Sequence, residues 1–432
     1  MRQILGEAGF CQRHKRRAVD FTRRRRFCFM TTVVLLLQKS VRSIQLRLNE
    51  FFDGLGQCLE PVSASAWSQA RLKLSHSAFV ELNQSVLVEP FYGPANGAGW
   101  QAWRGHRLVA IDSSWIHLPP TEPMGQEFGW VECKNQKGPC GRYVQGRLSV
   151  LTDVLNRMAL ETFLVGWQTH ERTLALEHLK ALAAQDIALL DRGFAAYDLF
   201  ARFIARERHF VCRCSQNTFG VVSRLLAADQ ARVSEVVTLS APNGTVSELR
   251  AAGLAVEIGV RFVTVRLNTG ELEVLATNLL DERAYPAEIL GELYGKRWGI
   301  ETYYELLKSR LDLENFSGRS VEAVRQDVHA TIFLSNLESV LTRSTQRQMQ
   351  AQSSESNAAS RQVNRAVSFH TLKWHLMELL LSKEPPAKVL QKLQRFFATA
   401  PLTRRPGRKI PRAKPSSWRS YWFQRNVRKS IF

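Results

Sequence analysis

Two aspartates stand at the ends of predicted strands, where the sites of many α/β proteins form. Residues 108–112 and residues 187–191 are each a short apolar run that ends on an acid. Ligands bind beyond the carboxyl ends of the strands in an open α/β sheet, so Asp112 and Asp191 are candidates for one shared site. An Asp in this position is more often a turn residue or a helix cap. Two aspartates alone leave both interpretations open.

A third acid lies in a helix predicted over residues 286–311, which starts at a proline. The side chains that share one face of this helix are Tyr294, Arg297, Glu301 and Lys308. At about 100° per residue they fall within an arc of roughly 60°. A salt-bridged surface stripe gives the same pattern, because pairs spaced like Arg297 and Glu301 are common on helices. Glu305, one turn further along this face, is a rival to Glu301.

The segments around these residues predict an α/β fold with helical regions at both ends. Strand and helix patterns alternate through the middle of the chain, and residues 216–284 are richer in strands, which indicates a β-rich insertion. The predicted parts are a helical N-terminal domain (1–98), a core (99–215 and 285–343), the insertion (216–284) and a C-terminal region (344–432). We expect the first twenty residues to be disordered and residues 344–361 to form a linker before further helices.

The N-terminal region contains two short predicted helices over residues 62–74 and 76–84, joined tightly. The side chains that this pair would expose are Gln69, Arg71 and Lys73. Such a pair is typical of a helix-turn-helix that binds DNA. Two helices that only pack on the core would give the same pattern, so both interpretations remain open.

The net charge of +20 is concentrated at the two ends of the chain. Residues 1–50 hold twelve Lys and Arg against three acids, and residues 401–432 hold ten against none. Basic segments of this kind contact nucleic acid or anionic membranes, or are solvated tails. The most apolar run, residues 27–37, is too short for the roughly 20 residues that span a bilayer. Nucleic acid is therefore the favoured partner.

Four stretches, taken in order, resemble the insertion-sequence-four family of bacterial transposases. The first three are residues 65–75 (SAWSQARLKLS), 110–114 (AIDSS) and 190–194 (LDRGF), and the fourth is the helix face that matches the family's Tyr-Arg-Glu-Lys signature. The resemblance covers roughly residues 21–425. It departs from the family at Ser113, where many relatives have Gly, and the first twenty residues match nothing in it.

The resemblance implies an RNase H-like catalytic core in which the β-rich insertion separates the second Asp from the Glu. It also implies a triad, both catalytic and metal-binding, of Asp112, Asp191 and Glu301, and its spacing chooses Glu301 over Glu305. Hard cations take carboxylate oxygens, and two Mg²⁺ ions, or Mn²⁺ as a substitute, activate a water or a DNA 3′-hydroxyl and stabilise the leaving oxygen.

The same resemblance implies DNA contacts and partners. Tyr294, Arg297 and Lys308 would bind phosphates at the transposon end, and residues 62–84, with Gln69, Arg71 and Lys73, would recognise the terminal inverted repeats. The basic stretch over residues 401–432 would assist. The implied partners are double-stranded DNA, both the terminal repeats and the target, and a second copy of the chain in a synaptic complex. The expected location is the bacterial cytoplasm at the nucleoid, with no membrane.

Two other readings of the chain remain. One is a nuclease or resolvase on the same core fold that cuts DNA without joining it. The other, of a different class, is a DNA-binding regulator or domesticated protein whose nuclease core is inactive. The Tyr-Arg-Glu-Lys face and the β-rich insertion argue against the first reading, and the intact set of three acids argues against the second.

Overall fold

The computed structural model describes residues 1–23, 25–38, 43–56, 62–94, 99–135, 138–267, 269–355 and 360–403. The basic tail proposed over residues 401–432 therefore lies outside the described residues from residue 404 onward. The chain folds as two compact units. The helical unit comprises Met1–Ala95, Leu118–Glu127 and Leu307–Phe432, and the sheet unit comprises Asn96–His117 and Phe128–Leu306.

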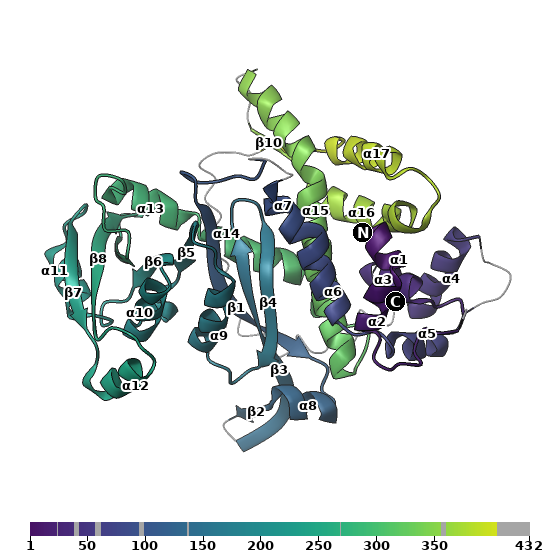
Figure 1. The fold of residues 1–432 in the computed structure, drawn as a ribbon, viewed down its shortest axis with the longest axis horizontal. Coiled ribbons are helices and arrows are strands. Elements are labelled where there is room, and N and C mark those ends of the chain that lie inside the picture. Colours follow the sequence, from purple (N-terminus) through teal and green to yellow (C-terminus); the bar gives the residue numbers. More distant parts are fainter. Residues whose placement is uncertain are drawn as a thin grey trace. The chain divides into compact units, whose positions relative to one another are not determined.

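The sheet unit is built on one nine-stranded mixed sheet with the order β2-β3-β1-β5-β6-β9-β8-β7, and β4 pairs with β3 (Figure 1). The strands are β1 (Arg107–Leu118), β2 (Trp130–Asn135), β3 (Gly138–Asp153), β4 (Met158–Gly166), β5 (Asp186–Leu190), β6 (His209–Cys214), β7 (Ser234–Ser240), β8 (Glu257–Arg266) and β9 (Leu272–Thr277). β1, β5 and β6 run parallel, and β6 pairs with β9 antiparallel. The α/β prediction is confirmed at this level.

Helices pack on this sheet through apolar faces. They are α9 (Glu171–His178), α10 (Tyr197–Ala205), α11 (Gly220–Ala228), α12 (Val246–Ala251), α13 (Ala287–Gly295) and α14 (Trp298–Glu305). In α10, Phe200 and Phe203 lie on one face three residues apart, and both rings contact Phe210 of β6 at centroid distances of 4.4 and 5.6 Å. Burying these rings fixes α10 directly beside the strand that follows β5 in the sheet.

β1 does not end at Asp112 as predicted, but continues to Leu118. Its pairing with β5 does stop near the acid, since the last paired residues are Ala110 and Leu189. Beyond that point Ile116 and Leu118 are still buried, and β3 flanks the strand on its other side. The sequence shows the apolar run before Asp112 but not the neighbouring strand that prolongs β1.

The strands of residues 216–284 extend the central sheet. β8 and β9 form the predicted hairpin, with Arg266 paired to Leu272, and β9 joins the sheet by pairing with β6. Residue 268, in the predicted turn, lies outside the described part of the chain. The β-rich segment is therefore continuous with the sheet that carries Asp112 and Asp191.

The single helix predicted over residues 286–311 is broken into α13, α14 and the π-helical turn η6 (Leu306–Arg310). The break falls at Lys296 and Arg297, whose amides bond to residues three positions back instead of four. Gly295 precedes the break, and glycine is a weak helix former because its backbone is free in the unfolded chain. The assumption of one straight helix face is therefore wrong between Tyr294 and Glu301.

The helical unit is built around the long helix α15 (Val321–Glu355), which contacts α3, α6, α16 and α17 (Figure 1). Its other elements are α1 (Arg2–Gly6), α2 (Ala8–His14), α3 (Phe29–Leu37), α4 (Ile44–Gly54), α5 (Ala64–Arg71), α6 (Ser77–Leu82), η1 (Asn83–Val88), α7 (Glu89–Tyr92), α8 (Glu122–Phe128), α16 (Arg365–Leu381), α17 (Pro386–Ala398), β10 (Arg361–Gln362) and β11 (Leu402–Thr403). None of the helices described is long and apolar enough to cross a membrane.

Two expectations for this unit are wrong. The first twenty residues are folded, because α1 and α2 bury Leu5 and Phe10, and Phe10 packs edge-on against Phe29 of α3. The linker expected from residue 344 is helical as far as Glu355, where α15 ends. Polar composition suggested a linker there, but packing of α15 against α17 outweighs it.

Candidate active site

The parallel register sets the two predicted aspartates beside each other. Ala110 pairs with Leu189, so extending the register by two residues brings Asp112 level with Asp191. Leu190 pairs with Cys212, so Arg213 stands next to Asp191 on the other side. Side chains at one level of neighbouring strands point to the same face, about 4.8 Å apart along the sheet. Two acids and one cation therefore share one edge of the sheet unit.

Asp112 is a half-buried carboxyl whose pKa is raised to about 6. Burial is the largest cause. The amide of Ser113, which donates to Oδ1 at 2.8 Å, and the charge of Arg297 oppose it. The carboxylates of Asp191 and Glu171 raise the pKa further. Burial thus disfavours the charged form of Asp112, and a bound cation would stabilise that form.

Asp191 follows β5 and is paired with Arg213 of β6. The Nη2 atom of Arg213 lies 3.1 Å from Oδ1 of Asp191, and its Nη1 donates to Oε1 of Glu273 at 2.6 Å. Burial lowers the pKa of Arg213, but the hydrogen bond to Glu273 and the charges of Tyr294 and Asp191 raise it more. Oδ1 of Asp191 is buried, and the contact with Arg213 does not have hydrogen-bond geometry.

Arg297, at the break between α13 and α14, joins the third acid to the other two. Its Nη2 donates to Oε1 of Glu301 at 2.5 Å, and its side chain is largely buried. Burial lowers the pKa of Arg297, but four nearby acidic groups raise it more, so the net shift is upward. These groups are Tyr294, Asp191, Glu301 and Asp112, in decreasing order of effect. All three predicted acids therefore raise the pKa of one guanidinium, and Glu301 binds it directly.

The three carboxylates are candidate ligands for a metal ion. Within the described ranges, no group of three His, Cys, Asp or Glu side chains is arranged to hold a metal ion. The convergence of the three acids on a shared metal ion therefore stays a prediction. The donor set still fits a hard cation, because it consists of carboxylate oxygens and Oδ1 of Asp191 is buried without a hydrogen bond. The guanidinium groups of Arg213 and Arg297 supply the positive charge here.

The side chain of Tyr304 joins α14, which carries Glu301, to β1, which carries Asp112. Its hydroxyl lies 2.8 Å from the carbonyl oxygen of Asp112 and 3.1 Å from that of Leu148. The hydroxyl of Ser149 lies 3.4 Å from the same Asp112 carbonyl and is itself 3.0 Å from Nε2 of the buried His178. Nothing in the sequence around Tyr304 marks a bond to a strand that precedes it by nearly 200 residues.

A fourth carboxylate, Glu171 at the start of α9, also lies close to Asp112. Its Oε2 accepts a hydrogen bond from the hydroxyl of Ser113 at 3.4 Å and lies 3.8 Å from Nη1 of Arg147. A side-chain carbon on Gly193 would stand 2.5 Å from Oε1 of Glu171, so glycine leaves room for this carboxylate after Asp191. Glu171 was not among the residues predicted from the sequence.

The remaining residues of the predicted signature differ in their surroundings. Tyr294 is buried, and its hydroxyl has no hydrogen-bond partner among the described residues. Glu305 is exposed, whereas Glu301 is half-buried against Arg297. Lys308 lies in η6, within the helical unit. Of the two rival acids, Glu301 is the one that faces the cluster.

The three residues proposed to read DNA in the helical unit separate into two kinds. Arg71 is buried and forms an ion pair of 2.9 Å with Asp327, and it also donates to Gln326 at 2.7 Å. Arg71 therefore cannot reach DNA, which corrects the prediction: it holds α5 against α15. Gln69 is exposed and Lys73 half-buried, and both remain available at the surface.

Comparison with known proteins adds the family. The transposase DDE domain matches residues 103–337, more than half of the chain and including all three acids. The transposase InsG for insertion sequence element IS4 of Escherichia coli (strain K12) is 23% identical over 281 residues, covering 64% of this chain and 60% of that protein. The chain thus spans about three fifths of this relative's length. A solved piggyBac transposase synaptic complex with hairpin DNA matches with a TM-score of 0.39 and 10% identity, over 90% of this chain and 78% of that one. The chain belongs to the DDE transposases, in the insertion-sequence-four family.

Proposed function

We propose that this chain is a Mg²⁺-dependent transposase that cleaves DNA at the ends of an insertion sequence and joins those ends to target DNA. The observation that supports this most is the arrangement around Arg297. Asp112 and Asp191 are level on adjacent parallel strands, and Glu301 binds the guanidinium that both of them influence. Three carboxylates from three elements at one edge of a sheet are what a metal-dependent phosphoryl transfer requires.

The roles follow from the surroundings of each side chain. Asp112, Asp191 and Glu301 would hold Mg²⁺, or Mn²⁺ in its place, which when bound activates the attacking oxygen and stabilises the leaving oxygen. Arg297 keeps the acids from repelling one another until that charge arrives, and it can then turn to a DNA phosphate with the planar fork that suits phosphate oxygens. Tyr304 fixes the backbone of Asp112 in place.

We further propose an RNase H-like core, supported by the hairpin of β3 and β4 that is followed by the parallel strands β1, β5 and β6 in the sheet. Tyr294, Arg297 and Lys308 would contact phosphates at the element's end. Tyr294 and Arg297 are buried now, so these contacts require local movement. A second copy of the chain would complete a synaptic complex on double-stranded DNA.

The test is a cleavage and strand-transfer assay on the inverted repeats that flank the gene, with Mg²⁺ titrated. Glu301→Ala is expected to abolish both steps while end binding is kept, because a metal ligand contributes several kcal/mol and each 1.4 kcal/mol is tenfold in rate. Glu305→Ala, one turn further along α14, is the matched control and is expected to act like the wild type.

The outcomes separate the competing functions. Cleavage without joining would show a nuclease or resolvase. Sequence-specific binding with no cleavage by the wild type at any metal concentration would show a regulator with an inactive core. Loss of activity in Glu305→Ala but not in Glu301→Ala would overturn the assignment of the third acid.

A further inference from the structure

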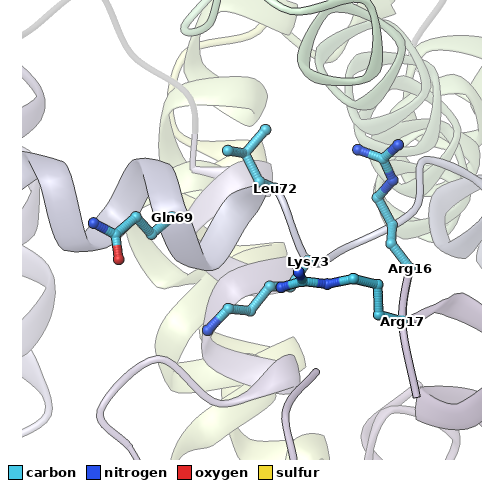
Figure 2. Close-up of a pocket in the computed structure, with 5 residues that line it drawn as sticks. All are labelled: Arg16, Arg17, Gln69, Leu72 and Lys73. Carbon is cyan, nitrogen blue, oxygen red and sulfur yellow. The ribbon is translucent and has the colours of Figure 1, made fainter. Parts of the chain in front are cut away.

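A hollow on the helical unit gathers cations from two distant parts of the chain. It has a volume of about 470 Å³ and is lined by Arg16, Arg17, Gln69, Leu72 and Lys73. Figure 2 shows Gln69 and Leu72 on and just after α5, Lys73 in the turn that follows, and the two arginines on the segment after α2. Arg16 and Arg17 belong to the first twenty residues, which resemble nothing in the family.

Backbone hydrogen bonds hold these two segments together. The amide of Arg16 donates to the carbonyl of Lys73 at 2.9 Å, and the amide of Ser75 donates to the carbonyl of His14 at 2.8 Å. Lys15 and Leu74 form an antiparallel bridge between them. Main-chain bonds therefore fix the two backbone segments from which the cationic side chains extend.

The side chains around the hollow are more cationic than their neighbours can neutralise. Arg17 donates to Asp20 at 3.1 Å, and Arg16 interacts electrostatically with Glu322, which is itself hydrogen bonded to His76. The side chains of Lys73 and Gln69 make no hydrogen bond or ion pair with any residue that the structure describes. Like charges held together repel, so an anion placed among them would stabilise the unit.

The polar side chains of α5 lie in two different environments. Arg71 points inward and is neutralised by Asp327, whereas Gln69, two residues earlier, is exposed at the hollow. Leu72 is 50% exposed beside them, which suits contact with the apolar face of a sugar. The same short segment thus supplies one structural cation and one face that is open to a ligand.

We propose that Arg16, Arg17 and Lys73, with Gln69, form a binding site for backbone phosphates of duplex DNA. This inference rests on the proposed function and deepens it, because it assigns the contact to phosphates and includes residues outside the family resemblance. A site made of cations and one amide positions a duplex without reading its bases. Arg and Lys that meet phosphates release condensed counterions, so binding here is independent of sequence and sensitive to salt.

The experiment measures binding of the full chain to a labelled 30-base-pair duplex of arbitrary sequence, by fluorescence anisotropy in EDTA over a range of salt concentrations. We expect the triple variant Arg16→Ala, Arg17→Ala, Lys73→Ala to bind about 10- to 100-fold more weakly at low salt. The slope of log K against log salt should fall by roughly 2 to 3, since each lost phosphate contact contributes about 0.9.

The matched control removes three exposed arginines from the sheet unit, Arg206, Arg250 and Arg283, so that the net charge changes equally. The double variant Arg16→Ala, Lys73→Ala leaves the Arg17–Asp20 pair in place and guards against misfolding, and thermal unfolding of each variant verifies this. An equal loss in triple variant and control, or no loss in the double variant, would overturn the site.

Two further results distinguish this site from the proposed function. Wild-type chain that fails to bind any duplex, including the flanking inverted repeats, would overturn the proposed function along with the site. If the wild type and the triple variant both bind duplex normally, the site alone would be overturned. A further outcome is that inorganic phosphate binds the hollow at millimolar concentration while the triple variant keeps its affinity for duplex. The hollow would then be a site for free anions, and that result would also overturn the proposal.

Discussion

The hydroxyl of Tyr304, one turn beyond Glu301 on α14, donates a hydrogen bond of 2.8 Å to the backbone carbonyl of Asp112 on β1. The bond is partly buried and joins two elements that each carry a candidate metal ligand. It fixes the backbone of Asp112, and therefore the place from which its carboxyl group starts, without touching any reacting atom. Tyr304 is accordingly a positioning residue.

Tyr304→Phe is expected to lower the free energy of unfolding by about 1–2 kcal/mol, because the carbonyl oxygens of Asp112 and Leu148 lose their shared donor. Cleavage should then require roughly tenfold more Mg²⁺, as is typical when a group that orients a ligand is lost. The control is Tyr197→Phe, whose hydroxyl donates to the carbonyl of Ala255 at 3.0 Å, away from the acids. Metal titrations that shift equally in both variants would reduce Tyr304 to a purely structural role.

Arg71→Ala is expected to destabilise the helical unit without weakening DNA contacts directly. The side chain of Asp327 is 0% exposed, and without Arg71 it keeps hydrogen bonds from Ser317 but loses its ion pair, at a cost of about 3–5 kcal/mol. Gln69→Ala, two residues earlier and exposed, should change stability by less than about 0.5 kcal/mol. Urea unfolding of both variants measures this difference. Equal stabilities would mean that Arg71 is not the structural anchor that its contacts indicate.

The sequence alone predicted the part of the site that depends on local pattern. The apolar runs before Asp112 and Asp191 mark strands, and Glu301 was separated from Glu305 only by the spacing of a family signature. It did not predict what depends on distant partners. Arg71 looks like an exposed helix residue until its pair with Asp327, some 250 residues away, is seen, and Tyr304 bonds to a strand that precedes it by nearly 200 residues.

The same reasoning explains the errors in the elements. β1 continues past Asp112 because β3 lies beside it, which no local pattern shows. The first helices are ordered because Phe10 and Leu5 find buried places against later segments, although the surrounding sequence is basic. Local propensity sets which segments are helices or strands, while tertiary contacts set where each one begins and ends.

Acid is expected to destabilise the helical unit through His329 on α15. Burial lowers the pKa of His329 to about 3, and the charges of His76 and Arg325 lower it as well, against Glu322, which raises it. The folded pKa lies below the unfolded value of about 6.5. Between these two pKa values the unfolded chain binds a proton at His329 and the native chain does not. The contribution of His329 to the free energy of unfolding is therefore fully present above about pH 6.5 and is lost as the pH falls toward 3.

The measurement compares urea unfolding at pH 7.5 and pH 5.0 for the wild type and His329→Phe. The wild type should lose about 1–2 kcal/mol more than the variant over this interval, since the residue as a whole is half-buried and solvent reduces the full linkage effect. His370→Phe, at an exposed position on the same unit, should leave the pH profile of the wild type unchanged. Parallel profiles for the wild type and His329→Phe would rule out this histidine as the cause.

Substitution of Arg213 and substitution of its partner Glu273 should have opposite effects on metal binding at the acids. Arg213 sits between Asp191, at 3.1 Å, and Glu273, at 2.6 Å, and its positive charge competes with a divalent cation for Asp191. Arg213→Gln removes that charge and should tighten binding of Mg²⁺ or Ca²⁺ by on the order of 1 kcal/mol or more, roughly fivefold. Glu273→Gln frees Arg213 to neutralise Asp191 alone and should weaken binding.

Calorimetric titration without DNA, below the unfolding temperature of each variant, measures both constants. Because each variant removes one half of the same ion pair, a general loss of stability would move the two constants in the same direction, and that result would contradict the role given to Arg213.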